Sequence, residues 1–332
     1  LYGQYFNSPL DKETPYLDGD PVYYPDVRTG RYELADDRKN SKPNYEDEFK
    51  SFFPRMWSPK KNHVRAYKEW SGFEGKPVKY RDSRGQMSTI RKPKFSENIS
   101  FFFKYQIGWM YFRYFMWNFS GRQNDTQGHG NFQDGNWMTG VPFIDEAHVG
   151  NQDELPSYLE NQKARNFFFV LPLILGLLGM LFHFKADKRN AWVVLLLFLF
   201  TGLAIVVYLN QYPYQPRERD YAYAGSFYAF AIWIGFGVLA LYDAARNLTI
   251  KDLGQTIGMT VGGALALTLV GSMFGGNESF AMLMVYIAVV SAALLALMYG
   301  IGQVVKDQKL QAGLATALCL IAPILMAKDG WD

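Results

Sequence analysis

Two arginines and two acidic residues alternate within a proline-containing loop, residues 210–221 (NQYPYQPRERDY), that separates two strongly apolar segments. These segments, 191–209 and 222–242, contain no Lys, Arg, Asp or Glu. Charged groups fixed where apolar helices enter a membrane are energetically expensive, so such a cluster is by default a candidate functional site. The loop is therefore the first place where this sequence could do chemistry.

The chemistry that this loop favours is phosphate binding. A guanidinium group can pair with phosphate oxygens through two parallel hydrogen bonds, and Arg217 and Arg219 lie two positions apart. They are the predicted phosphate ligands. The neighbouring side chains are predicted to orient these arginines or to line the same cleft: Glu218, Asp220 and Tyr221. The alternative, a solvated loop whose charges pair with one another, stays open.

An aromatic segment, residues 97–125, supplies two weaker candidates for the same role, Arg113 and Arg122. Most of its side chains are aromatic, a composition typical of the membrane interface, where Trp and Tyr concentrate. We expect an interfacial helix that presents Lys104 and Arg113 to lipid headgroups or to a lipid phosphate. A helix packed on the rest of the protein, without a ligand role, is the alternative.

A glycine-rich segment, residues 120–150, follows and contains six side chains of types that can bind metals. Their spacing matches no metal motif, so no metal site is predicted. A loop of this length and composition is more typical of a lid or of a cradle for an acceptor substrate. The six residues are Asp125, His129, Asp134, Asp145, Glu146 and His148.

The charged residues are unevenly distributed along the chain. Residues 166–332 hold ten of the 34 Lys and Arg and nine of the 31 Asp and Glu, which leaves 24 and 22 in residues 1–165. A polar, aromatic-rich part is thus joined to an apolar part near Asn166. Neither part is basic enough to suggest nucleic-acid binding. A single cysteine, Cys319, excludes an intrachain disulfide.

The apolar part predicts a bundle of membrane-spanning helices. A helix needs roughly 20 apolar residues to cross a bilayer, and six stretches without Lys, Arg, Asp or Glu qualify or nearly do so. The predicted fold class is therefore mainly α, a polytopic membrane bundle of about six spans. The stretches are 166–184, 191–209, 222–242, 254–274, 279–302 and 310–327.

Small residues recur at helical spacing in two of these stretches. Gly254, Gly258 and Gly262 share one face of the fourth predicted span. Small side chains at this spacing let helix backbones approach closely in lipid. We therefore expect the fourth span to use this face as a close helix contact.

The loop charges predict which side of the membrane each loop faces, because short cytoplasmic loops carry an excess of Lys and Arg. Three links each contain at least two Lys or Arg: 185–190, 243–253 and 303–309. Link 275–278 contains none, and the 210–221 loop is an exception whose two arginines are balanced by two acidic residues. The three basic links are predicted to be cytoplasmic. Residues 1–165 and the 210–221 loop are then extracytoplasmic.

Four regions are expected along the chain. Residues 1–96 are rich in turns and are predicted to form an irregular extracytoplasmic region, with short strands around turns at 22–34 and 75–90. The other regions are an interfacial helix with the glycine-rich loop (97–165), the membrane bundle (166–327) and a short extracytoplasmic end (328–332).

Several blocks of this sequence closely resemble a large bacterial membrane family, long catalogued as a domain of unknown function, that is related to the eukaryotic transmembrane-protein O-mannosyltransferases. The resemblance extends from about residue 97 onward, and residues 1–96 match only loosely. The blocks are MYFRYFMWNFSGRQND (110–125), GVPFID (140–145), LPSYLENQKARN (155–166), YLNQYPYQPRERDYAYAGSFYAFAIWIG (208–235) and DGWD (329–332).

The resemblance implies a type C membrane glycosyltransferase of the bacterial inner membrane. Such an enzyme uses a polyprenyl-phosphate sugar, with mannose as one candidate, and transfers the sugar to a protein hydroxyl on the extracytoplasmic face. Its expected partners are thus membrane lipid, the lipid-linked sugar and a protein acceptor. No cofactor is required, and the need for a divalent metal stays open.

The same resemblance implies that the chain is an internal or C-terminal fragment. The family places its catalytic carboxylate in the first extracytoplasmic loop, which is expected upstream of Leu1. The catalytic base is therefore not assigned to any residue here. Asp329 and Asp332 are expected at the outward end of the last span, where they could line the same cleft as the 210–221 loop.

Two other functions are alternatives to the transferase. A non-catalytic membrane subunit of an envelope-assembly or secretion complex could use the aromatic segment as a docking surface, but it needs no concentrated charge at the mouth of the bundle. A transporter should place ionisable groups near the membrane midplane, and the six stretches contain no Lys, Arg, Asp or Glu. The transferase is therefore the favoured hypothesis.

Overall fold

The structure of the 332-residue chain is a computed structural model. It describes residues 3–4, 10–36, 42–51, 60–81, 85–273 and 278–329. The chain divides into two compact units. Unit 1 comprises Leu1–Phe102 together with Asn210–Tyr214, and unit 2 comprises Phe103–Leu209 together with Gln215–Asp332.

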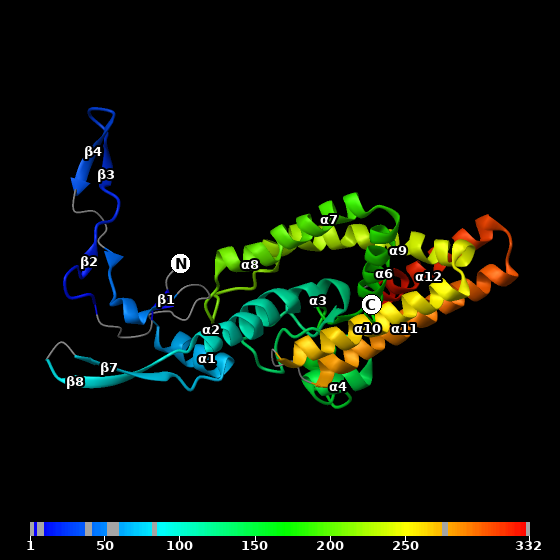
Figure 1. Cartoon of the computed structure of the whole chain (residues 1–332), viewed down its shortest axis with the longest axis horizontal. Coiled ribbons are helices and arrows are strands. Elements are labelled where there is room, and N and C mark those ends of the chain that lie inside the picture. Colours follow the sequence, from blue (N-terminus) through cyan, green and yellow to red (C-terminus); the bar gives the residue numbers. More distant parts are fainter. Residues whose placement is uncertain are drawn as a thin grey trace. The chain divides into compact units, whose positions relative to one another are not determined.

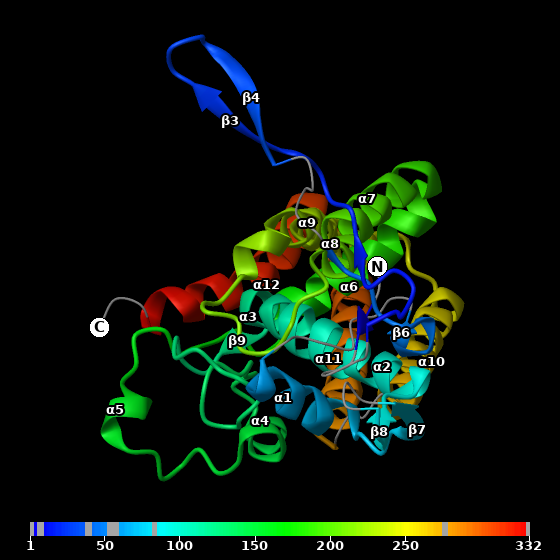
Figure 2. The same ribbon diagram turned by 90° about the vertical axis from the view of Figure 1, so that its left-hand side faces the viewer.

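Unit 1 contains two β-hairpins. Strands β3 (Val22–Asp26) and β4 (Arg31–Asp36) form the first, and β7 (Lys76–Arg81) and β8 (Met87–Lys92) form the second (Figures 1 and 2). They lie at the two places where the sequence predicts strands around turns. The remaining short elements of unit 1 are β1 (Gly3–Gln4) paired with β6 (Lys50–Ser51), β2 (Tyr16–Leu17) paired with β5 (Lys42–Pro43), and the 3-10 turn η1 (Asp47–Phe49).

Unit 1 also contains a helix that the sequence reading missed, α1 (Lys61–Ser71). Its buried residues His63, Ala66 and Tyr67 fall on one face, which is the spacing of an amphipathic helix. The helix ends at Gly72, whose φ of 65° is left-handed, as is common after helix C-termini. The His63 ring stacks on Tyr212, with 4.8 Å between ring centroids, which explains why residues 210–214 belong to unit 1.

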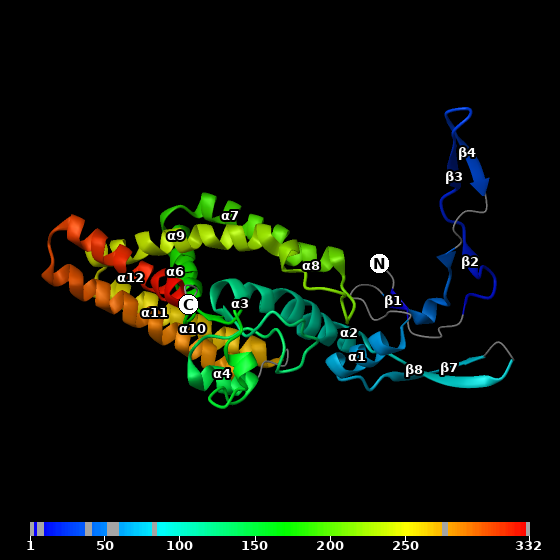
Figure 3. The same ribbon diagram turned by 180° about the vertical axis from the view of Figure 1, so that it is seen from behind.

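Unit 2 is helical, and four of its helices are long and apolar enough to cross a membrane (Figures 1 and 3). They are Lys188–Leu209, Asp220–Asn247, Ile250–Ser272 and Glu278–Val304. The elements of unit 2, with the π-helix that leads into it, are η2 (Phe102–Phe112), α3 (Arg113–Phe119), β9 (Gly121–Arg122), α4 (Pro142–Val149), α5 (Ser157–Glu160), β10 (Asn166–Phe167), α6 (Leu171–Ala186), α7 (Lys188–Thr201), α8 (Leu203–Leu209), η3 (Asp220–Tyr223), α9 (Ala224–Asn247), α10 (Ile250–Met273), α11 (Glu278–Val304) and α12 (Gln308–Asp329).

Each of the six stretches predicted as spans is largely helical, with 191–209 divided between α7 and α8, so the prediction of a mainly helical protein is confirmed. Helix α6 has 16 residues, fewer than the roughly 20 that cross a bilayer. Helix α12 is not among the four that meet the criteria of length and hydropathy within the described residues. The structure thus supports a membrane protein with four candidate spans, and the count of six stays a prediction.

The aromatic segment is helical from Phe95 to Phe119, through α2 (Phe95–Phe101), η2 and α3. Its middle part, η2, is a π-helix of 11 residues, a rare geometry that is frequent at functional sites. Within unit 2, the ring of Phe115 lies 4.9 Å from that of Phe230 in α9 and 6.0 Å from that of Phe198 in α7. At least this part of the segment therefore packs on the helices of the bundle.

Close helix contacts in unit 2 depend on glycines other than the predicted ones. A Cβ on Gly179 of α6 would collide with the Trp233 carbonyl oxygen and lie 2.5 Å from the amide nitrogen of Gly237, both in α9. A Cβ on Gly302 of α11 would collide with the carbonyl oxygen of Ala245. By contrast, a Cβ on the predicted contact glycines of α10 would have no neighbour within 4 Å among the described residues: Gly254, Gly258 and Gly262. The prediction of a close contact on this face of α10 was therefore wrong.

The glycine contacts give a direct test of the helix packing. Gly179→Ala should destabilise the detergent-solubilised protein by about 1–3 kcal/mol, because α6 and α9 must separate to admit the methyl group. The matched control, Gly258→Ala, adds the same methyl group where no described atom lies within 4 Å and should leave the melting temperature unchanged or raise it slightly, because alanine has the higher helix propensity. Equal melting temperatures for the two variants would contradict the packing of α6 on α9.

Candidate functional site

The candidate site in unit 2 is built around Arg113, the first residue of α3, which is 1% exposed. Its Nε donates to the carbonyl oxygen of Trp109 at 3.0 Å, and its Nη1 donates to the carbonyl oxygen of Gly135 at 2.8 Å. Its Nη2 forms an ion pair with Oε2 of Glu218 at 2.8 Å, and Nη1 lies 3.3 Å from Oε1 of the same carboxylate. The guanidinium thus makes the two-pronged contact that is typical of strong arginine–carboxylate pairs.

Aromatic rings surround this guanidinium. Its central carbon lies 4.3 Å from the ring centroid of Trp109, 4.4 Å from that of Tyr114 and 4.7 Å from that of Trp117. Such rings attract a cation through their negative faces and also exclude water. Arg113 was predicted to face lipid headgroups, but its charge is turned into the protein and matched by Glu218.

The carboxylate of Glu218 accepts hydrogen bonds from three residues. Besides Arg113, the hydroxyl of Tyr114 donates a short hydrogen bond to Oε2, and the amide of Gly128 donates to Oε1 at 3.2 Å. Burial, the largest single influence, raises the pKa of this carboxyl, but the Arg113 charge and the hydrogen bonds together outweigh it and lower the pKa below its ordinary 4.5. Glu218 is therefore ionised at neutral pH.

The glycine-rich loop that supplies Gly128 and Gly135 is tied together by its own amide side chains. Oδ1 of Asn124 accepts from the amide of Gly135 at 2.8 Å, and its Nδ2 donates to the carbonyl oxygen of Gln133 at 2.8 Å. Gly135 has a φ of 61°, and a Cβ there would lie 3.1 Å from Nη1 of Arg113. A side chain at this position would therefore disturb the carbonyl contact to Arg113.

Arg219 differs from Arg113 because its guanidinium has no partner in the described part of the chain. Its backbone amide donates to the hydroxyl of Tyr114 at 3.1 Å, so the Tyr114 hydroxyl links it to Glu218. Its Nε is buried without a hydrogen-bond acceptor. The hydroxyl of Tyr223, a residue that is 0% exposed and feels the charge of Arg219, is likewise buried without a partner. Buried polar groups are normally satisfied, so these two groups lack an acceptor that a ligand could supply.

The other predicted residues of this loop are placed differently. Arg217 is exposed, and its side chain forms no hydrogen bond or ion pair with the described residues. Tyr221 is 60% exposed. Asp220 begins η3, and its charge acts on the guanidinium of Arg122.

Arg122, like Arg113, lies close to the ring of Trp117. Its guanidinium carbon is 3.9 Å from the Trp117 ring centroid, and its Nε donates to the carbonyl oxygen of Asn124 at 2.8 Å. Burial lowers the pKa of Arg122, while the charges of Asp125 and Asp220 counteract this effect. Arg122 is therefore held by the glycine-rich loop as well as by its aromatic neighbour.

The prediction that Glu218 orients Arg217 or Arg219 through its carboxylate was wrong, because that carboxylate binds Arg113 instead. Asp329 is the last residue of α12, and nothing about its side chain is described. Asp332 lies outside the described residues. The expected contribution of these two aspartates to the cleft stays a prediction.

Asp145 and His148 are among the metal-type residues of the glycine-rich segment that have structural partners. The carboxylate of Asp145 accepts from the amide and hydroxyl of Thr139 and from the amide of Gly140, each at 2.8 Å. His148 stacks on Trp137 with 3.9 Å between ring centroids, and burial lowers its pKa to about 4. Among the described residues, no group of three or more His, Cys, Asp or Glu could hold a metal ion.

Four residues of the site escaped the sequence reading: Tyr114, Gly128, Gly135 and Tyr223. Helix α3 and the 217–223 turn are 105 positions apart at Arg113 and Glu218. No local sequence pattern therefore indicates that the two segments are in contact. Two cavities lie away from this site. One, of about 310 Å³, is lined by residues that include Ala240 and Leu248, and the other lies in unit 1. The arrangement places the half-buried Arg219, whose Nε is buried without an acceptor in the described residues, beside a fixed ion pair.

Comparison with known proteins gives one match. Residues 1–103 match the model of a family of unknown function (DUF8416). No curated protein and no solved structure matches the chain. The match covers the Leu1–Phe102 part of unit 1 and does not reach the Arg113–Glu218 site.

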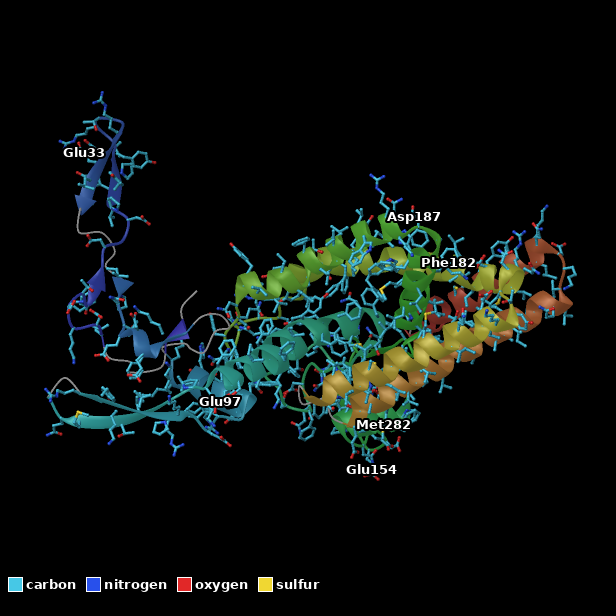
Figure 4. All side chains as sticks on the ribbon, in the orientation of Figure 1. Glu33, Glu97, Glu154, Phe182, Asp187 and Met282 are labelled. Carbon is cyan, nitrogen blue, oxygen red and sulfur yellow. The ribbon has the colours of Figure 1, made fainter. Side chains whose placement is uncertain are left out.

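The ion pair makes a prediction about stability. Glu218→Gln should destabilise the protein by about 3–5 kcal/mol, because it leaves the buried guanidinium of Arg113 without a counter-charge. The matched control is Glu154→Gln, which removes the same charge from an exposed loop position (Figure 4) and should change the melting temperature little. A Glu218→Gln variant as stable as the control would show that the pair is not needed for folding.

The lowered pKa of Glu218 adds a pH dependence. Since the folded pKa lies below the unfolded one, the stability from this group is present above pH 4.5 and is lost as the pH falls through the folded pKa. Unfolding of the wild type and of Glu218→Gln should therefore be compared between pH 7 and pH 3. The stability difference between them should shrink toward acid pH, and a constant difference would contradict this assignment.

Proposed function

We propose that this chain binds the phosphate of a polyprenyl-linked sugar and belongs to a membrane glycosyltransferase that transfers the sugar to a protein hydroxyl. The observation that carries the proposal is the guanidinium of Arg219, whose Nε is buried and has no acceptor in the described residues. A buried N–H group without an acceptor is unfavourable. A phosphate group would supply the missing oxygens and charge.

The position of Arg219 favours a lipid-borne phosphate over a free one. Arg219 immediately precedes Asp220–Asn247, a helix long and apolar enough to cross a membrane. A phosphate at this end of the helix would lie near headgroup depth, with its hydrocarbon tail free to follow the apolar surface. The resemblance of residues 208–235 to a membrane transferase family points the same way.

The residues then take distinct roles. Arg219 holds the phosphate, the hydroxyl of Tyr223 donates to one of its oxygens, and the exposed Arg217 adds a second positive charge. Arg113 supports the site, because its hydrogen bonds and charge are already used by Glu218. Arg113 and Arg122 were the weaker predicted phosphate ligands, and neither is preferred to Arg219 for this role.

The chemistry of transfer explains why such a cation is useful. The acceptor hydroxyl oxygen bonds to the anomeric carbon while the bond from that carbon to the phosphate oxygen breaks. The phosphate leaves with the electron pair, and the hydroxyl proton passes to a carboxylate base. Fixed cations stabilise the negative charge that develops on the departing phosphate. The base is not assigned to a residue of this chain.

The loop charges support an orientation for this reaction. With the Lys- and Arg-rich links at 185–190, 243–253 and 303–309 in the cytoplasm, the Arg219 loop faces outward. The proposed location is therefore the extracytoplasmic face of a bacterial inner membrane. The acceptor would be a protein on that side.

The test is binding of a polyprenyl phosphate to the purified chain in detergent, counted by native mass spectrometry, with labelled-sugar transfer measured in parallel on the longer protein that includes the expected upstream carboxylate. Arg219→Ala should weaken binding by at least about tenfold, as expected for loss of a charge-assisted contact, and abolish transfer. Arg217→Ala should have a smaller effect, because its side chain is exposed. The matched control is Arg246→Ala, which removes an arginine near the other end of α9.

Each result decides something. Wild-type binding by Arg219→Ala would remove the phosphate role from this residue. Absence of binding and of transfer in well-folded wild-type protein would overturn the transferase and favour a non-catalytic subunit of an envelope-assembly complex.

A further inference from the structure

Unit 1 contains a cavity of about 350 Å³ at the base of the β7–β8 hairpin. Pockets of this size accommodate small-molecule ligands. Four of its eight lining side chains are lysines, and one is acidic. The lining residues are Glu48, Lys50, Lys76, Val78, Lys92, Pro93, Lys94 and Phe95.

Two of these lysines are placed opposite each other across the hairpin. Lys76 of β7 is the direct cross-strand partner of Lys92 of β8, an arrangement in which like charges destabilise a sheet. Nζ of Lys92 donates a short hydrogen bond to the carbonyl oxygen of Glu48, which carries no net charge. The ammonium of Lys76 makes no hydrogen bond or ion pair with the described residues. Neither ammonium group is thus paired with a carboxylate of the described residues, and the repulsion between Lys76 and Lys92 is not offset.

The other two lysines are already neutralised. Nζ of Lys50 lies 2.7 Å from Oδ1 of Asp47, and Nζ of Lys94 lies 2.6 Å from Oε2 of Glu74. The surplus positive charge of the cavity thus belongs to Lys76 and Lys92. The segment around them is also strongly basic, because residues 76–94 contain seven Lys and Arg and a single acidic residue.

The walls of the cavity are fixed by a buried carboxylate, Glu97 of α2 (Figure 4). Its Oε1 accepts from the amides of Glu74 and Gly75 at 2.8 and 2.9 Å, and its Oε2 accepts from the amide of Lys94 at 2.8 Å. Gly75 has a φ of 70°, and a Cβ there would lie 2.7 Å from the Phe73 ring. The start of β7 and the segment after β8 are therefore held in a defined geometry before any ligand arrives.

The remaining lining is apolar. Val78 and Pro93 are buried, whereas the ring of Phe95 is 59% exposed. An exposed aromatic ring beside ammonium groups suits a ligand with both an anionic group and a face of C–H bonds, such as a sugar ring. The volume leaves room for such a ring in addition to the anion.

We propose that this cavity binds a phosphorylated sugar, with the phosphate bridging Lys76 and Lys92 and the sugar ring against Phe95. A compact ammonium group is a common phosphate ligand, and a bridging dianion would convert the repulsion between the two strands into attraction. The phosphate could be free or could end a larger glycan or lipid, and the two sources share this chemistry. The site lies in unit 1 and is independent of Arg219.

Calorimetric titration of the full chain in detergent tests the proposal, with glucose 6-phosphate, inorganic phosphate and glucose as probes. Glucose 6-phosphate should bind more tightly than inorganic phosphate, and glucose should not bind. Lys76→Gln should weaken glucose 6-phosphate binding about tenfold, as for loss of one charge-assisted contact. The matched control, Lys79→Gln, removes the same charge from an exposed position on the same strand outside the cavity lining and should change the affinity less than about twofold.

A second readout separates binding from folding. Without ligand, Lys76→Gln should melt at the wild-type temperature or above, because it relieves the cross-strand repulsion. With glucose 6-phosphate, only the wild type and Lys79→Gln should gain stability. Vesicles containing a polyprenyl phosphate that compete with glucose 6-phosphate would identify a lipid source, and absence of competition a soluble one. Equal weakening by Lys76→Gln and Lys79→Gln, or no binding by the wild type, would overturn the site.

Discussion

The ion pair between Arg113 and Glu218 is the interaction on which the candidate site depends. Both groups are taken largely out of water, and a buried charge is tolerated only when its partner and its hydrogen bonds are in place. Here the partners come from three parts of unit 2. Helix α3 supplies Arg113 and Tyr114, the glycine-rich loop supplies the Gly128 amide and the Gly135 carbonyl, and the turn before α9 supplies Glu218. The pair therefore fixes three segments at once.

This arrangement also explains why Arg219 is left without a counter-charge. Glu218, one of its two acidic neighbours in sequence, is engaged by Arg113, while the Tyr114 hydroxyl holds the backbone amide of Arg219. The cation is thus positioned through its backbone, and its side chain stays available at the start of a membrane-long helix. An additional carboxylate beside Arg219 would neutralise it and remove the reason to bind phosphate.

The sequence predicts the helices of unit 2 well, because an apolar run of about 20 residues has few other uses, and it predicts both hairpins of unit 1 from their turns. It misleads where contacts depend on three-dimensional neighbours. Gly258 has helical spacing but faces open space, whereas Gly179 and Gly302 make close contacts without belonging to a repeated pattern. Likewise, nothing local to the 217–220 segment indicates that Glu218 pairs with Arg113, 105 positions away. The alternation of basic and acidic residues in this segment predicted instead that neighbours along the chain interact with one another.

The most direct test of the account is the affinity of a polyprenyl phosphate for folded Glu218→Gln protein compared with the wild type. Simple electrostatics favours tighter binding by the variant, since a negative charge beside an anion site is removed. The account predicts the opposite, a clearly weaker affinity, because loss of the carboxylate releases the loop and the turn that position Arg219. Equal or tighter binding by the variant would contradict the claim that the Arg113–Glu218 pair organises the site.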